Sequence, residues 1–205
     1  MASAIDPEAT DAFWAWFAAT IAPAWASLSD ELVAAIDARV DALAEALGPL
    51  DWEIGPHDGR TSYFALSPAG DRTQLTRTRA IVARAPTLDG WQFLPAKPPR
   101  SWMLQFTVAT PAGEVAIDGG EWECVLRRRG GHMLVDLRPP SAPALTDDDA
   151  ATAAYILVDG ELGEQARLEH VEDVAIVRGW SAREEAVARR LVPGLLARML
   201  GVAPR

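Results

Sequence analysis

Residues 122–137 read WECVLRRRGGHMLVDL, and this stretch decides the fold class of the chain. Apolar and polar residues alternate before and after Gly130-Gly131, a pattern typical of two antiparallel strands joined by a tight turn. The alternation places Trp122, Cys124 and Leu126 on one side of the first strand. We therefore expect an antiparallel sheet with one packed face and one face in water.

A second hairpin is predicted earlier in the chain. Two short aromatic or β-branched runs, 52–56 and 62–66, flank Asp58-Gly59, and Asp-Gly is a strong turn signal between such runs. After each hairpin come a proline-containing loop, a helical pattern and another strand, which ends near residue 93 or residue 177. A ββαβ duplication whose halves share one sheet is therefore one interpretation, although the two halves have few identical residues.

Helices are predicted ahead of the first hairpin. Asp6-Pro7-Glu8 combines a capping residue, a proline at the first helical position and an acid near the positive end of the helix dipole. Ser29 precedes a second helical pattern, which Gly48-Pro49 ends. We expect an α+β fold with an N-terminal helical segment, 1–49, packed on an α+β sheet domain, 50–205. The sheet is mainly antiparallel with helices on one face, and the whole chain forms one structural domain.

Two further helices are predicted in the last third of the chain. Thr146 stands before Asp147-Asp148-Asp149, and Ser181 with Glu184 matches a capping box. After the capping box, apolar residues recur at every fourth position from Val187 to Met199, which predicts a final helix that Pro193 kinks.

Charge and composition limit the classes of function. The chain has 205 residues, with 19 basic against 29 acidic residues and a net charge of −10. This charge disfavours nucleic-acid binding, which normally uses a basic surface. The first eight residues contain no lysine or arginine, unlike a secretory signal, and no stretch approaches a membrane-spanning length of apolar residues. We expect a cytoplasmic protein that does not bind membranes.

Several kinds of catalytic and metal site are disfavoured. Cys124 is the one cysteine, and the three histidines stand too far apart for a local zinc motif. The helix dipole explains the acids at 147–149 without a metal ion. The chain also lacks the glycine-rich loops of nucleotide-binding proteins and the nucleophile elbow of α/β hydrolases. We expect no cofactor and no metal, and we favour a non-enzymatic protein.

Two aromatic residues are candidate contacts for a partner. Trp14 and Trp16 are two positions apart, so a helix points them about 200° apart and one face cannot hold both. We therefore expect one of the two rings to be exposed, either as a contact for a partner protein, since aromatic residues are common anchors of interfaces, or as a ring that lies over the sheet. Packing in the core is an equally good interpretation of either ring.

Charged residues and a histidine complete the set of candidates. Acids beside tryptophans on strands can take part in acid–base chemistry when their pKa values are separated, although a hydrated sheet face is the commoner meaning. Arginines on a strand can hold an anion or an acidic partner, or they can protect a sheet edge. The candidate ligand- or partner-binding residues are Trp14, Trp16, Glu53, Glu123, Arg127, His132 and Glu164.

Several short segments resemble a known family. They are Phe-Trp-Ala-Trp-Phe at 13–17, Ala85-Pro86 with Gly-Trp-Gln-Phe at 90–93, Ala-Lys-Pro-Pro at 96–99 and Leu-Gly-Glu at 162–164. Together they resemble an uncharacterised family of bacterial α+β proteins of about this size. The resemblance covers most of the chain and implies a cytoplasmic bacterial α+β protein. It implies no catalytic residue, because no activity is assigned to that family.

Two hypotheses for the function follow. The first is a non-enzymatic binding protein, an adaptor or an immunity-type partner, that uses its acidic surface and exposed aromatic residues against a basic protein. The second is a small-molecule-binding protein or a minor enzyme with a carboxylate-lined cleft. A deep pocket that joins the candidate side chains favours the second hypothesis, and a flat hydrated sheet face favours the first.

Overall fold

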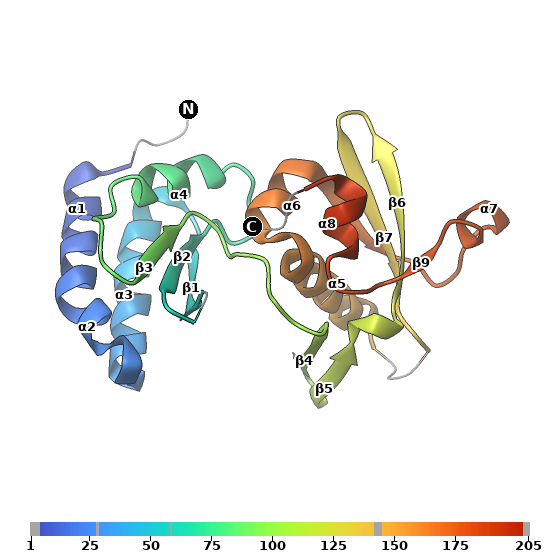
Figure 1. Ribbon diagram of the computed structural model, residues 1–205, viewed down its shortest axis with the longest axis horizontal. Coiled ribbons are helices and arrows are strands. Elements are labelled where there is room, and N and C mark those ends of the chain that lie inside the picture. The colour runs from blue at the N-terminus through green and yellow to red at the C-terminus, as the bar shows by residue number, and fades with distance from the viewer. Residues whose placement is uncertain (1–4, 28, 58, 142–144, 203–205) are drawn as a thin grey trace. The chain divides into compact units, whose positions relative to one another are not determined.

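The computed structural model describes residues 5–27, 29–57, 59–141 and 145–202. Helices and strands are both abundant, and the strands form three small sheets, so the predicted α+β class with an N-terminal helical region is confirmed (Figure 1). The chain divides into two compact units, Met1–Lys97 and Pro98–Arg205. In the described residues, no helix combines the length and the apolar character needed to cross a membrane.

The first unit combines helices with a three-stranded sheet. Its elements are α1 (Pro7–Trp16), the π-helical turn η1 (Phe17–Ile21), α2 (Ala22–Ala24), the 3₁₀ turn η2 (Trp25–Ser27), α3 (Asp30–Leu47), β1 (Asp51–Pro56), β2 (Ser62–Ser67), α4 (Leu75–Val82) and β3 (Trp91–Leu94). In the sheet, β2 is the central strand, antiparallel to β1 and parallel to β3.

The predicted helix starts of the first unit are confirmed. The Asp6 carboxylate accepts hydrogen bonds from the backbone N–H groups of Glu8 and Ala9, at 2.9 and 3.2 Å. The Ser29 hydroxyl accepts the N–H of Leu32 at 3.4 Å, and Gly48 ends α3 with a φ of 97°, which a glycine adopts without strain. Asp58, the expected turn residue of the first hairpin, lies outside the described residues.

Aromatic rings fill the core of the first unit. Phe13, Trp14 and Phe17 come from α1 and the start of η1, and they pack against Phe64 on β2 and Phe93 on β3. The N-terminal helices therefore share one core with the first sheet. For this reason the division at residue 97 differs from the expected boundary after residue 49.

The second unit contains two separate sheets. Its elements are β4 (Gln105–Thr110), β5 (Gly113–Asp118), the 3₁₀ turn η3 (Gly119–Glu121), β6 (Glu123–Arg129), β7 (His132–Arg138), α5 (Asp147–Leu162), α6 (Glu164–His170), β8 (Val171–Ile176), α7 (Ala182–Glu185), β9 (Arg189–Arg190) and α8 (Leu195–Leu200). β4 and β5 form a hairpin, and the larger sheet has the order β8-β7-β6-β9.

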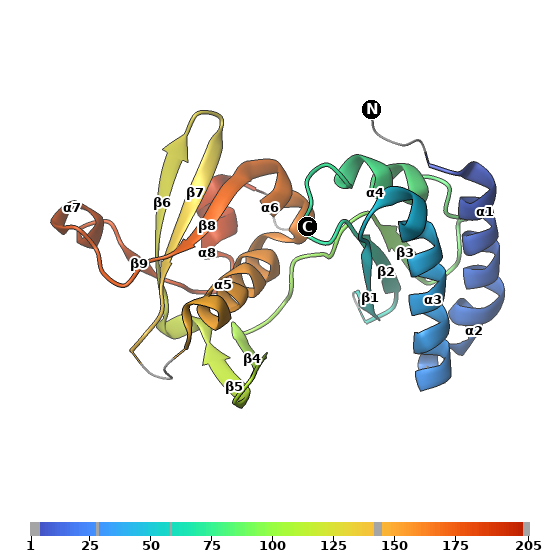
Figure 2. The ribbon, with the colours of Figure 1, turned by 180° about the vertical axis from the view of Figure 1, so that it is seen from behind.

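The core of the second unit lies between the larger sheet and α5. Cys124 and Leu137, on neighbouring strands, are fully buried and pack with Leu157 of α5 and Leu196 of α8. Figure 2 shows α5 beside the strands of this sheet. Helices thus cover the apolar face of this sheet, as expected. The opposite face carries charged residues, among them Glu123 and Arg127.

The two units repeat one connectivity. In each, a hairpin is followed by a helical connection and then by a strand parallel to the second strand of the hairpin, as in β1-β2-α4-β3 and β6-β7-α5-α6-β8. The expectation that both halves share one sheet is wrong, because the two sets of strands form separate sheets. A ββαβ duplication itself stays a prediction.

The predicted final helix is also wrong. The capping box forms between Ser181 and Glu184, but α7 lasts four residues and is followed by β9, which pairs with β6. α8 begins only after Pro193. A proline has no N–H to donate and disfavours helical geometry at the residue before it. The apolar residues at every fourth position from Val187 to Met199 therefore do not form one continuous helix.

Candidate functional site

The seven candidate residues do not form one site. Trp14, Trp16 and Glu53 belong to the first unit, whereas Glu123, Arg127, His132 and Glu164 belong to the second. Within the second unit, three of the four lie on the β6–β7 hairpin and Glu164 lies at the start of α6. The hairpin is therefore the place where candidate residues come together.

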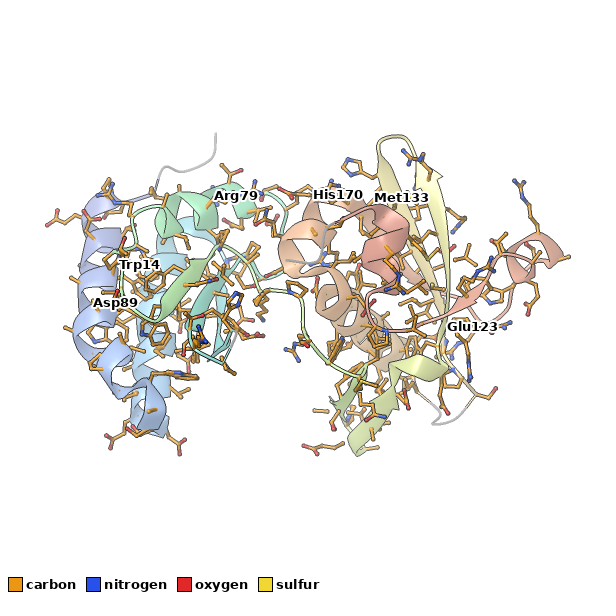
Figure 3. All side chains as sticks on the ribbon, in the orientation of Figure 1. Trp14, Arg79, Asp89, Glu123, Met133 and His170 are labelled. Atoms are coloured by element: carbon orange, nitrogen blue, oxygen red, sulfur yellow. The ribbon has the colours of Figure 1, made fainter. Side chains whose placement is uncertain are left out.

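Trp14 is a core residue and not a surface contact. Its side chain is 2% exposed, and its Nε1–H donates to the carbonyl oxygen of Ile81 at 2.9 Å. Figure 3 labels it between α1 and β3. Trp16 is half-buried, with the Arg39 guanidinium 5.0 Å from its ring centroid. Trp16 is thus the more accessible ring of the pair.

Glu53 and Glu164 are each held within the fold. Glu53 on β1 is half-buried and accepts the hydroxyl hydrogen of Tyr63 on the neighbouring strand. Glu164 is 3% exposed. Near it in the sequence, the buried Glu161 accepts the N–H groups of Gly194 and Leu196, at 2.9 and 3.4 Å, and so caps the start of α8. Neither Glu53 nor Glu164 presents an open carboxylate to a partner.

The polar face of the β6–β7 hairpin carries the other three candidates. Side chains alternate along a strand, so Glu123 and Arg127 share one face of β6, and the cross-strand pair Arg129–His132 brings His132 to the same face. His132 is half-buried, and its Nδ1 has no hydrogen-bond partner among the described residues. We call this surface the polar hairpin face.

Arg127 holds a buried carboxylate on the neighbouring strand. Its Nε and Nη2 groups donate to the two oxygens of Asp136 at 2.5 and 2.8 Å, a forked geometry that gives strong charge-assisted hydrogen bonds. The side chain of Asp136 is 2% exposed and that of Arg127 is 50% exposed. This hydrogen bonding raises the pKa of Arg127 above its ordinary value. The main role of Arg127 is thus to compensate the negative charge of the buried Asp136.

Glu123 is at the centre of a second network. Its carboxylate accepts the indole N–H of Trp180 at 3.2 Å and forms an ion pair with Arg138. The Arg138 guanidinium also lies 5.5 Å from the Trp180 ring centroid and 3.3 Å from Glu185. The hydrogen bond from Trp180, and then Arg138, outweigh partial burial and lower the pKa of Glu123. Glu123 is therefore ionised near neutral pH and is a poor proton donor.

Cys124 does not supply a nucleophile. It is fully buried on the apolar side of β6, and burial raises its pKa from 9.0 to about 11. A reactive cysteine needs an accessible site that favours the thiolate. Cys124 packs in the core as a small apolar residue.

A cavity adjoins the Glu123 network. Its volume is about 380 Å³, and it is open to solvent. Both acidic and basic side chains surround it, with two prolines between them. The lining residues are Glu121, Glu123, Arg138, Pro139, Pro140, Ser141 and Arg178. Glu123 is the one sequence candidate in this lining, so the cavity does not join the seven residues.

Sequence reasoning missed the partners of these candidates. Asp136 and Arg138 could have been found from the hairpin register, because a turn at Gly130-Gly131 places them opposite Val125 and Glu123. Trp180 and Glu185 come from a segment more than forty residues further along the chain. No periodic signal links that segment to the hairpin.

A separate concentration of negative charge lies on the N-terminal helices. Eight acids and one arginine occur between residues 6 and 45, and every acid is exposed. The acids are Asp6, Glu8, Asp11, Asp30, Glu31, Asp37, Asp41 and Glu45, and the arginine is Arg39. We call this set the acidic helical face. It accounts for −7 of the total charge of −10.

Part of the acidic helical face is free of internal partners. Asp11 pairs with Arg84, and Asp37 accepts the indole N–H of Trp52 at 2.7 Å. Asp30, Asp41 and Glu45 form no ion pair with a described residue, and their spacing places them on one side of α3. The helix thus presents uncompensated negative charge to solvent.

Comparisons with known proteins assign the chain to no family. Comparison with family models, with curated proteins and with solved structures finds no match to the chain. Across the described residues, no three His, Cys, Asp or Glu side chains come close enough to hold a metal ion together. The fold and the surfaces define an α+β protein of two units, with an acidic helical face on the first and a charged hairpin face on the second.

Proposed function

We propose that this chain is a non-enzymatic binding protein that engages a basic partner protein through the acidic helical face. This proposal rests on one observation: the N-terminal helical segment has eight exposed acids and only one arginine between residues 6 and 45. Concentrated charge of one sign speeds and orients association with a surface of opposite sign. We include in this proposal that the chain acts as an adaptor or an immunity-type protein and that it belongs to the bacterial family it resembles.

The helical scaffold supports binding over a broad surface. α3 has 18 residues, which corresponds to about 27 Å of helix. Its apolar side, with Ile36 and Val40, is fixed in the core, so the opposite side is presented rigidly. A rigid surface loses little entropy when it binds.

The chemistry of the hairpin supports binding over catalysis. Glu123 and Asp136 are both held by arginines, and the pKa of Cys124 is about 11. A general acid or base works best with a pKa near the working pH, and a nucleophile needs an accessible and activated group. Glu123 and Asp136 therefore stabilise the fold through ion pairs, and Cys124 stabilises it by packing in the core.

Affinity capture with charge variants tests the proposal. In the acidic-face variant, Asp30→Asn, Glu31→Gln, Asp41→Asn and Glu45→Gln remove four charges that have no ion-pair partner among the described residues. The control variant removes four exposed charges of the second unit by Glu114→Gln, Asp148→Asn, Glu172→Gln and Asp173→Asn. Both variants have the same net charge.

The expected capture result depends on salt. Wild type and control retain a basic protein in about 0.1 M salt and lose it in about 1 M, where the Debye length falls from ~10 to ~3 Å. The acidic-face variant binds that protein about 10-fold more weakly or worse. Retention of the same protein by the acidic-face variant, or no captured basic protein, contradicts the proposal.

The cavity beside Glu123 favours a second candidate function, binding of a small polar molecule. Its volume of about 380 Å³ lies within the usual range for ligand sites. Two carboxylates and two guanidinium groups line it, which suits a ligand with one positive and one negative group. Glu121 is exposed and forms no ion pair with a described residue, so it is available to an amine.

The probe for this second candidate is glycylglycine, which has both charged termini. The Trp180 indole N–H resonance, assigned with Trp180→Phe, reports on the adjacent Glu123. Titration should shift this resonance in wild type and not in Glu121→Gln or Arg178→Gln. An equal response in Glu121→Gln, or no response in wild type, rules out this binding mode.

A further inference from the structure

A projecting segment of the second unit has no buried residue. We call residues 178–190 the arm; it contains α7 and β9, and both views place α7 at the outer side of the unit, beyond β6 (Figures 1 and 2). Ten of its thirteen residues are exposed and the other three are half-buried. A segment of this length with no share in the core gains little from the hydrophobic effect.

Polar contacts at its base hold the arm in place. The Trp180 indole donates to Glu123 and stacks with Arg138, which also pairs with Glu185. β9 pairs with the first two residues of β6. These contacts fix the direction of the arm and leave its outer side in solvent.

The acids of the arm have partners, and so does Arg178, which pairs with Asp147, whereas the other three arginines form no ion pair with a described residue. Glu184 accepts hydrogen bonds from the hydroxyl and the N–H of Ser181, and Glu185 lies against Arg138. Arg183, Arg189 and Arg190 are exposed, and none of the three forms an ion pair with a described residue. The free charge of the arm is therefore positive, in a chain of net charge −10.

Apolar side chains are exposed next to these arginines. Val187 within the arm is 50% exposed. Val192, two residues after the end of the arm, is 48% exposed. A surface with free cations and exposed aliphatic groups is complementary to a segment that carries both carboxylates and apolar side chains.

We propose that the arm is a docking element for an acidic segment of a partner protein, one in which carboxylates alternate with aliphatic side chains. Charge complementarity selects this occupant, because Arg183 and Arg189 form no ion pair with a described residue, and Arg190, which lies opposite Glu123 on β6, forms none either. The proposal is independent of the acidic helical face, which belongs to the other unit. If both hold, the chain joins a basic and an acidic protein, as an adaptor does.

Selection from a library of random short peptides, with the full chain immobilised, tests the proposal. The arm variant carries Arg183→Gln, Arg189→Gln and Arg190→Gln. The control variant carries Arg39→Gln, Arg72→Gln and Arg79→Gln, which remove three exposed arginines of the first unit. The expected result is enrichment of acidic peptides with aliphatic residues, and synthetic copies of these peptides bind wild type and control equally.

The arm variant should bind the same peptides about 10-fold more weakly or worse. Its Trp180 indole N–H resonance should keep the wild-type position, which shows that the arm is still docked on Glu123. A Val187→Ser variant should weaken binding without changing the dependence on salt, because it removes an apolar contact and no charge.

Three outcomes overturn the proposal. The first is a selection without acidic peptides, and the second is a set of acidic peptides that bind the arm variant as well as wild type. The third is self-association of the full chain, measured by analytical ultracentrifugation, that disappears in the arm variant; the occupant is then a second copy. Basic peptides that depend on the acidic helical face support the proposed function alone.

Discussion

Gly160 lies near the end of α5, and its missing side chain leaves room for the ring of Trp102. A Cβ at position 160 would overlap the indole, whereas a Cβ at Gly179 would meet nothing within 4 Å. Alanine normally favours a helix over glycine by about 1 kcal/mol, but overpacking a closed site costs about 1–3 kcal/mol. We expect Gly160→Ala to lower the free energy of unfolding in urea by about 1–2 kcal/mol.

Gly179→Ala is the control for that measurement, because it adds the same methyl group in open space. It should change the free energy of unfolding by less than about 0.5 kcal/mol. A Gly160→Ala protein as stable as wild type would show that the Trp102 ring does not pack on the helix as described.

Glu123 makes the arm contact sensitive to acid. Hydrogen bonding to Trp180 and the neighbouring Arg138 lower its pKa in the folded state. The stability that Glu123 contributes is therefore present above its unfolded pKa, about 4.3, and is lost as the pH falls through its lower folded value. The Trp180 indole N–H resonance should stay constant near neutral pH and move only in this acid range.

Glu123→Gln should remove this transition, since an amide does not titrate. The resonance then keeps one position through the acid range. A wild-type resonance that moves near neutral pH, or a transition that persists in Glu123→Gln, would assign the effect to another group.

Residue periodicity could predict that one of Trp14 and Trp16 is less buried, but not which one. The choice depends on Phe64 and Phe93, which reach the helix from strands about fifty and eighty residues later. Glu123 was found from its place on a strand. Its role was not, because Trp180 and Arg138 set it.

At the scale of elements, α8 depends on a residue of another helix. The Glu161 carboxylate on α5 accepts the N–H groups of Gly194 and Leu196 at the start of α8, and Glu161 is 6% exposed. Loss of hydrogen bonds to a buried charged acceptor costs about 1–3 kcal/mol. We expect Glu161→Ala to lower the free energy of unfolding by this amount.

Glu121→Ala serves as the control for Glu161→Ala, because Glu121 is exposed. It should leave stability nearly unchanged. Equal effects of the two substitutions would show that Glu161 does not cap α8.

Local signals predicted most helix starts and both hairpins, because caps, turn glycines and alternation act over a few residues. Asp6, Ser29 and Thr146 cap their helices as expected. After Ser181 the predicted capping box is present, but the helix that it starts is only four residues long. There, pairing of β9 with β6 decides the structure, and local patterns do not contain it.

At the scale of the whole molecule, the two units have separate cores. One cluster of buried apolar residues contains residues of the first unit, and the other contains residues of the second. Because each core is closed within its unit, fragments 1–97 and 98–205 should each fold. Circular dichroism with a cooperative thermal transition in both fragments checks this expectation, and a fragment without a transition contradicts it.

The arrangement of strands into sheets could not be predicted from the sequence. Both ββαβ patterns can be recognised in the sequence. Whether their strands form one sheet or two depends on which edge strands pair with each other, and the sequence pattern does not contain this information. β9 pairs with the start of β6 in the second unit, and β1 and β3 are the two edge strands of the first sheet. The acidic helical face follows from composition, but its exposure on α1 and α3 depends on packing against the first sheet.

Binding through the acidic helical face is tested most directly by mapping the bound partner on the chain by NMR. The ¹⁵N-labelled chain is titrated with the basic protein retained by wild type, in about 0.1 M salt. Amide shifts should change along the exposed side of α3, around Asp30, Asp41 and Glu45, and the changes should be absent in the acidic-face variant. Changes confined to the second unit, or the same changes in that variant, would contradict binding through the acidic helical face.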